Sequence, residues 1–375
     1  MTATVQDVVR AIGEAAPWGQ AAAWDAVGLH VGDADAAVTG VLVALDATPG
    51  VVDEAVRRGC NVLLTHHPLL FKPVACVTAA DPVGSLVLRM AQAGVAHVAA
   101  HTNLDASDAG VSAALAGQLG LANVRVLAPE QSRTHLVTVY VPHADADAVR
   151  DALAGTGAGR IGDYGGVSFS SDGAGRFTPG VGAQPAIGTV GQAERVDEAR
   201  VEALVPAWRV AGALAAVREA HPYEEPVAFA HPVAGVPTRE GYGALGELAA
   251  PEALVAFLDR VARALGTPAL RHVGDPDRPV RRVAVCGGSG LSFLPDALRA
   301  HADAYVTADV TYHRWFEALS PDGAPRIALV DAGHAETERV AETLLADIVR
   351  AALPGVPVLR TEERTDPSRV HVAAP

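Results

Sequence analysis

Two adjacent histidines, His66 and His67, are the residues of this sequence whose type and spacing most directly indicate chemistry. Apolar residues stand on both sides of the pair, at positions 62–64 and 69–70. Burying two imidazoles without partners would cost desolvation free energy, and neutral imidazole is the most common metal ligand in proteins. The pair therefore indicates a metal site, whereas a single histidine at a strand end is more often structural.

Other polar residues stand where apolar segments of the chain end. His101 closes one such segment, Asp105 follows it by four residues, and Asp309 closes a third segment. His334 and Glu338 come after the apolar residues 327–330 at a spacing of i,i+4, which places both on one face of a helix. Because ligands bind at the carboxyl ends of strands in α/β sheets, these residues are candidates for one shared site.

The candidate metal ligands are three histidines and two carboxylates: His66, His67, Asp105, His334 and Glu338. This set without a thiolate suits Zn²⁺, Fe²⁺, Mn²⁺ or Co²⁺. Five ligands are more than one catalytic zinc uses, but two ions that share a bridging carboxylate would use all five. We therefore expect two divalent metal ions per chain.

Three further residues, His101, Asp309 and His313, are candidates for acid–base catalysis beside the metals. An imidazole near a metal-activated water can move a proton, and an imidazole or carboxylate can equally orient a ligand from behind. Both roles stay open at this stage.

The elements that must position these residues follow a β-α-β order. Expected strands cover 38–45, 61–65, 95–100, 280–286, 304–307 and 327–330, and expected helices cover 51–58, 83–93, 109–119, 254–265 and 293–300. The strands are continuously apolar, which predicts a mostly parallel sheet covered on both faces.

The sequence pattern differs in the region between the N-terminal elements, which end near residue 119, and the C-terminal elements, which begin at residue 254. Residues 129–240 suit the order β-α-β-β-α-β, with a glycine-dense stretch between positions 155 and 191. We therefore expect an α/β fold split into two halves, 1–128 and 241–375, that carry the metal site. A ferredoxin-like α+β domain, 129–240, is inserted between them.

Composition excludes several other classes of protein. The 375 residues carry a net charge of −14, which argues against nucleic acid as a partner. Lys72 is the one lysine, so neither a Walker-type phosphate loop nor a Schiff-base enzyme with a different lysine fits. We expect a cytoplasmic protein, because the N-terminus lacks the order of a signal peptide and no apolar run is long enough to span a membrane.

The motifs around these residues resemble one known family. They are HHPLLFKP at 66–73, HTNLD at 101–105, GHAETE at 333–338, WDAVGL at 24–29, TADVTYH at 307–313 and TDP at 365–367. The chain is similar to the Nif-three-like dinuclear-metal proteins, homologues of GTP cyclohydrolase 1 type 2, in their long bacterial form with a PII/CutA-like insert. Ala308, Ala335 and Glu336 depart from the usual residues at their positions, and none of them is a candidate ligand.

The resemblance implies that the five candidate ligands hold the metals and that the protein forms a toroidal homohexamer. It also implies a metal-dependent hydrolase in which metal-activated water attacks a purine nucleotide or a related substrate. Two alternatives remain at this stage: a phosphoesterase, and a non-catalytic hexameric metal-binding or regulatory assembly whose insert senses a ligand.

Overall fold

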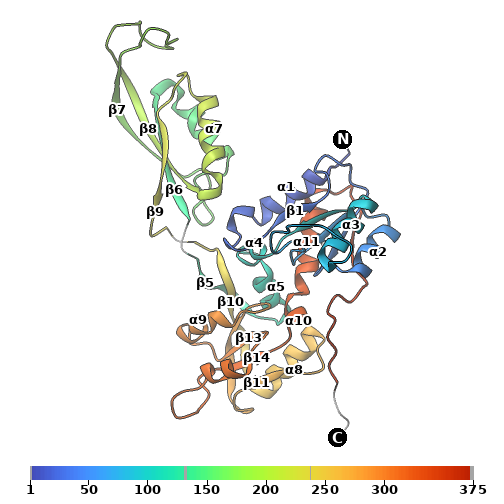
Figure 1. Ribbon diagram of the computed structural model, residues 1–375. Helices are drawn as coiled ribbons and strands as arrows, with labels where there is room; N and C mark the ends of the chain where they lie inside the picture. Colours follow the sequence, from blue (N-terminus) through green and yellow to red (C-terminus); the bar gives the residue numbers. More distant parts are fainter. Residues whose placement is uncertain (1, 131–132, 237, 372–375) are drawn as a thin grey trace. The chain divides into compact units, whose positions relative to one another are not determined.

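A computed structural model describes residues 2–130, 133–236 and 238–371 (Figure 1). The chain forms a mixed α/β fold with three sheets. It divides into two compact units, which we call the main unit (residues 1–130 and 239–375) and the insert unit (residues 131–238). The main unit holds two of the sheets, and the insert unit holds the third.

The first sheet of the main unit has five strands in the order β1-β4-β3-β2-β15. Their bounds are β1 Gly28–Val31, β2 Val41–Ala44, β3 Val62–Thr65, β4 Ala96–Ala99 and β15 Val358–Arg360. All run parallel except β1, which is antiparallel to β4.

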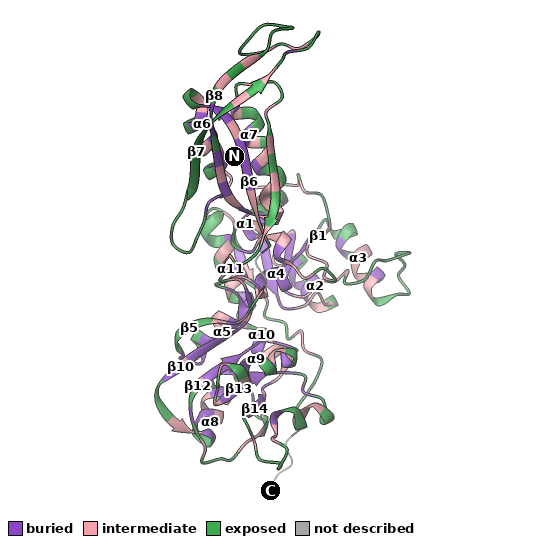
Figure 2. Ribbon diagram, turned by 90° about the vertical axis from the view of Figure 1, so that its left-hand side faces the viewer, coloured by how far each residue is buried: buried purple, intermediate pink, exposed green. Residues whose placement is uncertain are grey.

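Helices cover both faces of this sheet. On one face lie α1 (Val5–Ala15) and α11 (Val340–Ala352), and on the other lie α2 (Pro49–Arg57) and α3 (Pro82–Ala93). The alternate residues of β2 therefore enter two different cores, which explains why its strand sequence is continuously apolar. Every residue of β2, β3 and β4 is buried, whereas α2 and α3 carry both buried and exposed residues (Figure 2).

The second sheet has six strands in the order β11-β14-β13-β12-β10-β5. Their bounds are β5 Ala122–Pro129, β10 Gly241–Ala253, β11 Arg271–Val273, β12 Pro279–Val285, β13 Ala304–Thr307 and β14 Ala328–Asp331. Helices α5 (Val111–Gln118) and α8 (Leu254–Leu265) cover one face. Helix α9 (Leu294–Arg299) and the 3-10 segments η4 (Leu291–Phe293) and η5 (Tyr312–Ala318) cover the other.

The expectation of a mostly parallel sheet needs correction here. Only β12, β13 and β14 are parallel, while β5, β10 and β11 pair antiparallel with their neighbours. The reason is the connection of the chain: β5 leads out to residues 131–238, and β10 follows their return. The strands β5 and β10 pair antiparallel on either side of this excursion, as the two arms of a hairpin do.

Three short helices of the main unit lie between these elements. They are η1 (Trp18–Gln20), α4 (Thr102–Asp105) directly after β4, and α10 (His334–Glu338) directly after β14. Among the described residues, no helix has the length and hydrophobicity that crossing a membrane requires.

The insert unit is a four-stranded antiparallel sheet with two helices on one face. Its order is β7-β8-β6-β9, with bounds β6 Thr134–Pro142, β7 Ser168–Phe177, β8 Glu194–Pro206 and β9 Ala228–Val233. Helices α6 (Ala146–Gly155) and α7 (Val210–Ala220) follow the 3-10 turns η2 (His143–Asp145) and η3 (Ala207–Arg209). The valines of β6 and β8 that face the helices form the core of the unit.

Candidate metal centre

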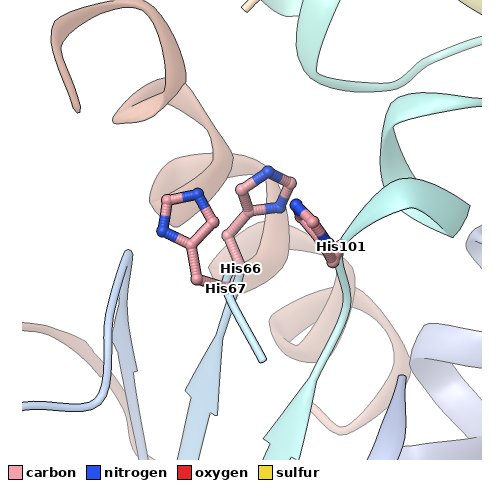
Figure 3. Close-up of side chains that lie close together, drawn as sticks. All are labelled: His66, His67 and His101. Atoms are coloured by element: carbon pink, nitrogen blue, oxygen red, sulfur yellow. The ribbon is translucent and has the colours of Figure 1, made fainter. Parts of the chain in front are cut away.

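The ends of two strands in the first sheet bring three histidine rings together. His66 and His67 follow β3 directly, and their backbone N–H groups donate to carbonyls at the end of β2. His101 follows the parallel neighbour β4. The ring of His101 lies 5.2 Å from that of His66 and 5.5 Å from that of His67 (Figure 3).

The second sheet supplies a histidine and a glutamate through the short helix α10. Gly333, with a φ of 87°, turns the chain after β14 so that α10 begins at His334. One turn later comes Glu338, whose Oε2 lies 2.9 Å from Nε2 of His334. The i,i+4 pair thus shares one face of α10 and meets the histidines of the first sheet.

Glu338 occupies the middle of a row of alternating carboxylates and imidazoles. Its Oε2 lies 2.8 Å from Nε2 of His67, whose Nδ1 lies 2.7 Å from Oδ1 of Asp46. On the other side, Nδ1 of His334 lies 2.7 Å from Oδ2 of Asp309. Each imidazole is therefore held by an outer carboxylate while its Nε2 is aimed at Glu338, as in metal-binding histidines.

His66 is fully buried and has one nitrogen without a partner. Its Nδ1 lies 2.9 Å from the carbonyl oxygen of Ala100, so Nδ1 carries the proton and donates it. Its Nε2 is buried and, among the described residues, has no hydrogen-bond partner. Nε2 lies 3.6 Å from Oδ1 of Asp105 and 4.0 Å from Oε1 of Glu338. An aromatic nitrogen lone pair left in this way is the group that a metal ion would satisfy.

The protonation of the three imidazoles follows from these contacts. Burial lowers the pKa of His66 to about 3, so this ring is neutral at pH 7. Although burial alone would lower it, the hydrogen bonds with Asp46 and Glu338 raise the pKa of His67 to about 10. The hydrogen bond with Glu338 raises the pKa of His334 to about 9. Two positive imidazolium rings therefore flank Glu338.

The two carboxyl groups respond in opposite ways. Burial opposes ionisation of Glu338, but the hydrogen bonds from His334 and His67 hold its pKa well below the usual value. Burial raises the pKa of Asp105 well above its usual value, and the charge of Glu338 raises it further. A carboxyl kept protonated by burial and by a neighbouring anion is one that a cation at the same place would ionise.

These donors fit divalent cations. The ligand atoms of His67, His334 and Glu338 lie within 4.8 Å of one another, and so do those of His66, His67 and His101. Nitrogen and oxygen donors without a thiolate suit Zn²⁺, Fe²⁺, Mn²⁺ or Co²⁺. Protons on His67 and His334 take the positions that such an ion would hold, which makes binding dependent on pH.

A glycine turn on the second sheet leaves room for Glu338. Gly288 has a φ of 59°, and a Cβ at this position would overlap Oε1 of Glu338 and lie 3.1 Å from Nε2 of His334. Its N–H donates to Oγ1 of Thr337 over 3.0 Å, which ties the turn to α10. Close packing against the candidate metal centre thus explains this glycine.

The residues predicted as acid–base candidates take different places. His101 lies in the cluster, and its Nδ1 lies 3.0 Å from Oδ1 of Asp25. Asp309, whose φ of 56° is rare for a residue other than glycine, lies behind His334. His313 is exposed, and its ring lies 5.2 Å from that of Tyr312. His313 is absent from the two clusters of possible ligand atoms that the described residues form.

Two carboxylates of the site were not among the residues predicted from the sequence. Asp46 orients His67, and Asp25 orients His101 while also accepting from the backbone N–H of Thr102 over 3.1 Å. Asp46 stands directly after the expected strand 38–45, so the rule that selected the histidines would also have selected it. Asp25 follows no strand, and only the three-dimensional arrangement reveals its role.

Two exposed aromatic residues stand beside the histidine cluster. The ring of Trp24 is 6.3 Å from that of His101 and 5.9 Å from that of Phe71. The exposed fractions are 63% for Trp24 and 43% for Phe71. Large exposed apolar side chains at the rim of a polar site are typical of a ligand-binding surface.

Comparison with known proteins places this arrangement in context. The sequence profile of Duf34/NIF3 (NGG1p interacting factor 3) matches residues 3–367. A protein from Mycobacterium tuberculosis, named GTP cyclohydrolase 1 type 2 homolog, is 44% identical over 342 residues, which cover 90% of this chain and 89% of that protein. A relative with the same name from Bacillus subtilis is 36% identical over 330 residues, which cover 88% and 87%.

Solved structures show the same likeness. The crystal structure of a Bacillus cereus protein related to NIF3 matches with a TM-score of 0.85 and 34% identity, covering 99% of this chain and 100% of that chain. A Staphylococcus aureus protein matches with a TM-score of 0.76 and 29% identity, covering 99% of both chains. The likeness thus extends over both units of the chain.

Proposed function

The chain belongs to the Duf34/NIF3 family, and on that premise we propose that it binds two divalent metal ions and hydrolyses a purine nucleotide. His66, His67, Asp105, His334 and Glu338 hold the metals in this proposal. The observation that carries it is the row of groups around Glu338, in which two imidazoles are held from behind by carboxylates and aimed at a common point.

The chain's own residues prepare this site for hydrolysis. Divalent ions bound here would supply Lewis acidity and lower the pKa of water, so that a nucleophile forms near neutral pH. Asp46 and Asp309 keep the rings of His67 and His334 in the orientation that binding requires. His101, with Nδ1 held by Asp25, is the residue to which we assign proton transfer at its other ring nitrogen, Nε2.

The rim and the names of the relatives support a nucleotide as the substrate. Trp24 offers an exposed ring next to His101, and Phe71 offers one next to Trp24, on which a planar base can stack. Lys72, the one lysine of the chain, is exposed directly after Phe71 and can attract an anionic substrate. The relatives are named for a cyclohydrolase that acts on GTP, which makes GTP the first compound to assay.

The remaining features of the proposal concern organisation. We assign residues 129–240 to a ferredoxin-like domain between two halves of the metal-binding domain, on the strength of its β-α-β-β-α-β order and antiparallel pairing. We also propose a toroidal homohexamer in the cytoplasm. A sedimentation mass about six times that of the 38.4 kDa chain would support the hexamer, and a mass near that of one chain would contradict it.

Turnover by a matched pair of variants tests the function. Glu338→Gln removes the central carboxylate charge and keeps its shape, while Glu336→Gln makes the same change two residues away on α10. With the protein loaded with Zn²⁺, Mn²⁺ or Fe²⁺, we expect GTP turnover to fall at least a hundredfold in Glu338→Gln and to persist in Glu336→Gln.

The same assay separates the alternatives. Equal turnover by the wild type and Glu338→Gln would overturn the proposed hydrolase. Turnover of p-nitrophenyl phosphate without turnover of GTP would identify a phosphoesterase. A protein that binds metal but turns over neither compound would be the non-catalytic assembly.

A further inference from the structure

The insert unit contains a cavity of about 740 Å³ that the metal chemistry does not use. Strands β7 and β8 form its floor on the face of the sheet away from α6 and α7. Residues 179–187, after β7, and residues 223–227, before β9, form its walls. The second of these segments belongs to the sequence His-Pro-Tyr-Glu-Glu-Pro at 221–226, for which the proposed hydrolase gives no role.

Glycines in β7 give the cavity its depth. Gly173 and Gly175 lie on the floor, and because they are glycines, β7 places no side chain in the cavity at these two positions. A Cβ at position 175 would overlap Oε2 of Glu198, so the carboxylate lies directly over the glycine backbone. Glycine inside a strand often marks such a close approach.

Glu198 is the buried charged group of this cavity. The residue is 8% exposed, and its Oε1 accepts a hydrogen bond from the Tyr223 hydroxyl over 3.0 Å. Burial and this bond raise the pKa of the Tyr223 phenol to about 12. Within the described residues, no arginine, lysine or histidine stands within 4.0 Å of the Glu198 carboxylate.

The charges around the cavity are mostly acidic, and within the described residues neither of its arginines forms an ion pair with Glu198. Four acids line the cavity, Asp172, Glu198, Glu224 and Glu225, against the two arginines Arg176 and Arg200. The Arg200 guanidinium donates to the carboxylate of Glu202, so the charge of Arg200 is balanced by Glu202. A buried carboxylate without a counter-charge is unfavourable, and a cation entering the cavity would relieve that cost.

The walls are suited to a flat apolar body. The ring of Phe177 lies 5.8 Å from that of Tyr223 at an angle of 61°, and Pro179 and Ile187 add apolar surface. The carboxylate of Glu224 accepts from the backbone N–H of Gln184 over 2.9 Å and so ties the two walls together. Aromatic faces attract cations in addition to binding flat apolar groups.

We propose that this cavity is a binding site for a small organic cation, an ammonium or amidinium group on a flat apolar body, with Glu198 as the anion that receives it. A planar amidinium matches a carboxylate with two parallel hydrogen bonds, so it is the cation that the site should bind best. The site is separate in its residues from the candidate metal centre.

Benzamidine and benzamide are the probes that test this proposal, because they share shape and differ in charge. Calorimetric titration of the full-length protein should show benzamidine binding at least tenfold more tightly than benzamide. Glu198→Gln should weaken benzamidine at least tenfold. Glu219→Gln, an exposed position on α7, should leave its affinity unchanged.

Hydrogen–deuterium exchange of the unaltered protein locates the site without relying on the folding of a variant. Benzamidine should slow exchange in residues 171–187 and 221–227. Equal affinity for benzamide and benzamidine, no binding of benzamidine, full affinity in a folded Glu198→Gln variant, or protection confined to other segments would each overturn the proposal.

Discussion

The candidate metal centre and the cavity of the insert unit both contain a buried glutamate, and they compensate its charge in different ways. Glu338, 4% exposed, lies between two imidazolium rings, each held by a second carboxylate. Glu198, 8% exposed, accepts one side-chain hydrogen bond from within the described residues, and its donor is the neutral phenol of Tyr223. In the first case the chain supplies positive charge that is exchangeable for a metal, while in the second the positive charge must come from a ligand.

The same contrast applies to the shape of the two sites. Around Glu338 the donors converge at fixed positions, which selects an ion by the type and number of its ligands. Around Glu198 apolar walls leave a cavity of about 740 Å³, which selects a molecule by its body as well as by its charge. Each site carries a glycine beneath its carboxylate, Gly288 and Gly175 respectively, and this parallel makes the comparison testable.

The largest expected effect comes from closing the space at Glu338. Gly288→Ala introduces a methyl group that overlaps Oε1 of Glu338, so we expect metal affinity to fall at least a hundredfold in competition with a chelating dye. Gly59→Ala is the matched control. Gly59 also has a positive φ, of 72°, but no atom lies within 4 Å of the added methyl. Equal metal affinity in the two variants would show that the space over Glu338 does not matter.

A smaller loss of metal affinity should follow when the carboxylates that orient His67 and His334 are removed, while Glu338 is left unchanged. Asp46→Asn and Asp309→Asn each remove a charge that holds a ring from behind, and outer carboxylates of this kind contribute about 10–100-fold to metal affinity. We expect a loss in that range by the same dye competition. Asp347→Asn, an exposed change on α11, should have no effect. If Asp46→Asn and Asp309→Asn both bound metal with wild-type affinity, the outer carboxylates would not contribute to the site around Glu338.

The corresponding change in the insert unit should act on the organic cation alone. Gly175→Ala displaces the Glu198 carboxylate, so benzamidine should bind about tenfold more weakly while metal content stays at the wild-type value. Gly173→Ala, whose methyl would have its nearest neighbour at 3.9 Å, is the control in the same strand. A loss of metal in Gly175→Ala would mean that the two sites are coupled rather than separate.

The smallest effect concerns a buried imidazole outside both sites. Burial lowers the pKa of His97, in β4, to about 3, whereas an unfolded chain binds the proton near pH 6.5. Since the folded pKa is depressed, the stability contribution is complete above pH 6.5 and falls on acidification toward pH 3, by at most about 1.4 kcal/mol per pH unit. Between pH 6 and pH 5, the free energy of unfolding of the metal-free wild type should therefore fall by about 1 kcal/mol more than that of His97→Gln. Urea unfolding at the two pH values measures this difference. Identical pH dependence in the wild type and the variant would contradict this.

The sequence was sufficient to find much of the main unit because its short strands are buried on both faces. The expected strands 61–65 and 304–307 agree with β3 (Val62–Thr65) and β13 (Ala304–Thr307), and the expected helix 254–265 is α8. Polar residues that interrupt such apolar runs stand out, which is why the residues around Glu338 could be selected as candidates.

The features that the sequence did not predict depend on contacts between distant segments. The ten-residue strand β7 lies inside the stretch 155–191, which the sequence shows only as glycine-dense, because Gly173 and Gly175 weaken its strand pattern. Gly175 is required by the close approach of Glu198, a residue more than twenty positions later. In the same way, the antiparallel pairing of β5 and β10 depends on where the chain returns after residues 131–238.

Metal content tests the central claim most directly. Protein purified without chelators from cells supplied with zinc, iron, manganese and cobalt is measured by mass spectrometry of its metals, alongside Glu338→Gln and Glu336→Gln. We predict two equivalents of divalent metal per chain in the wild type and in Glu336→Gln, and a loss of metal in Glu338→Gln. One equivalent or none in the wild type, or unchanged metal in Glu338→Gln, would contradict it.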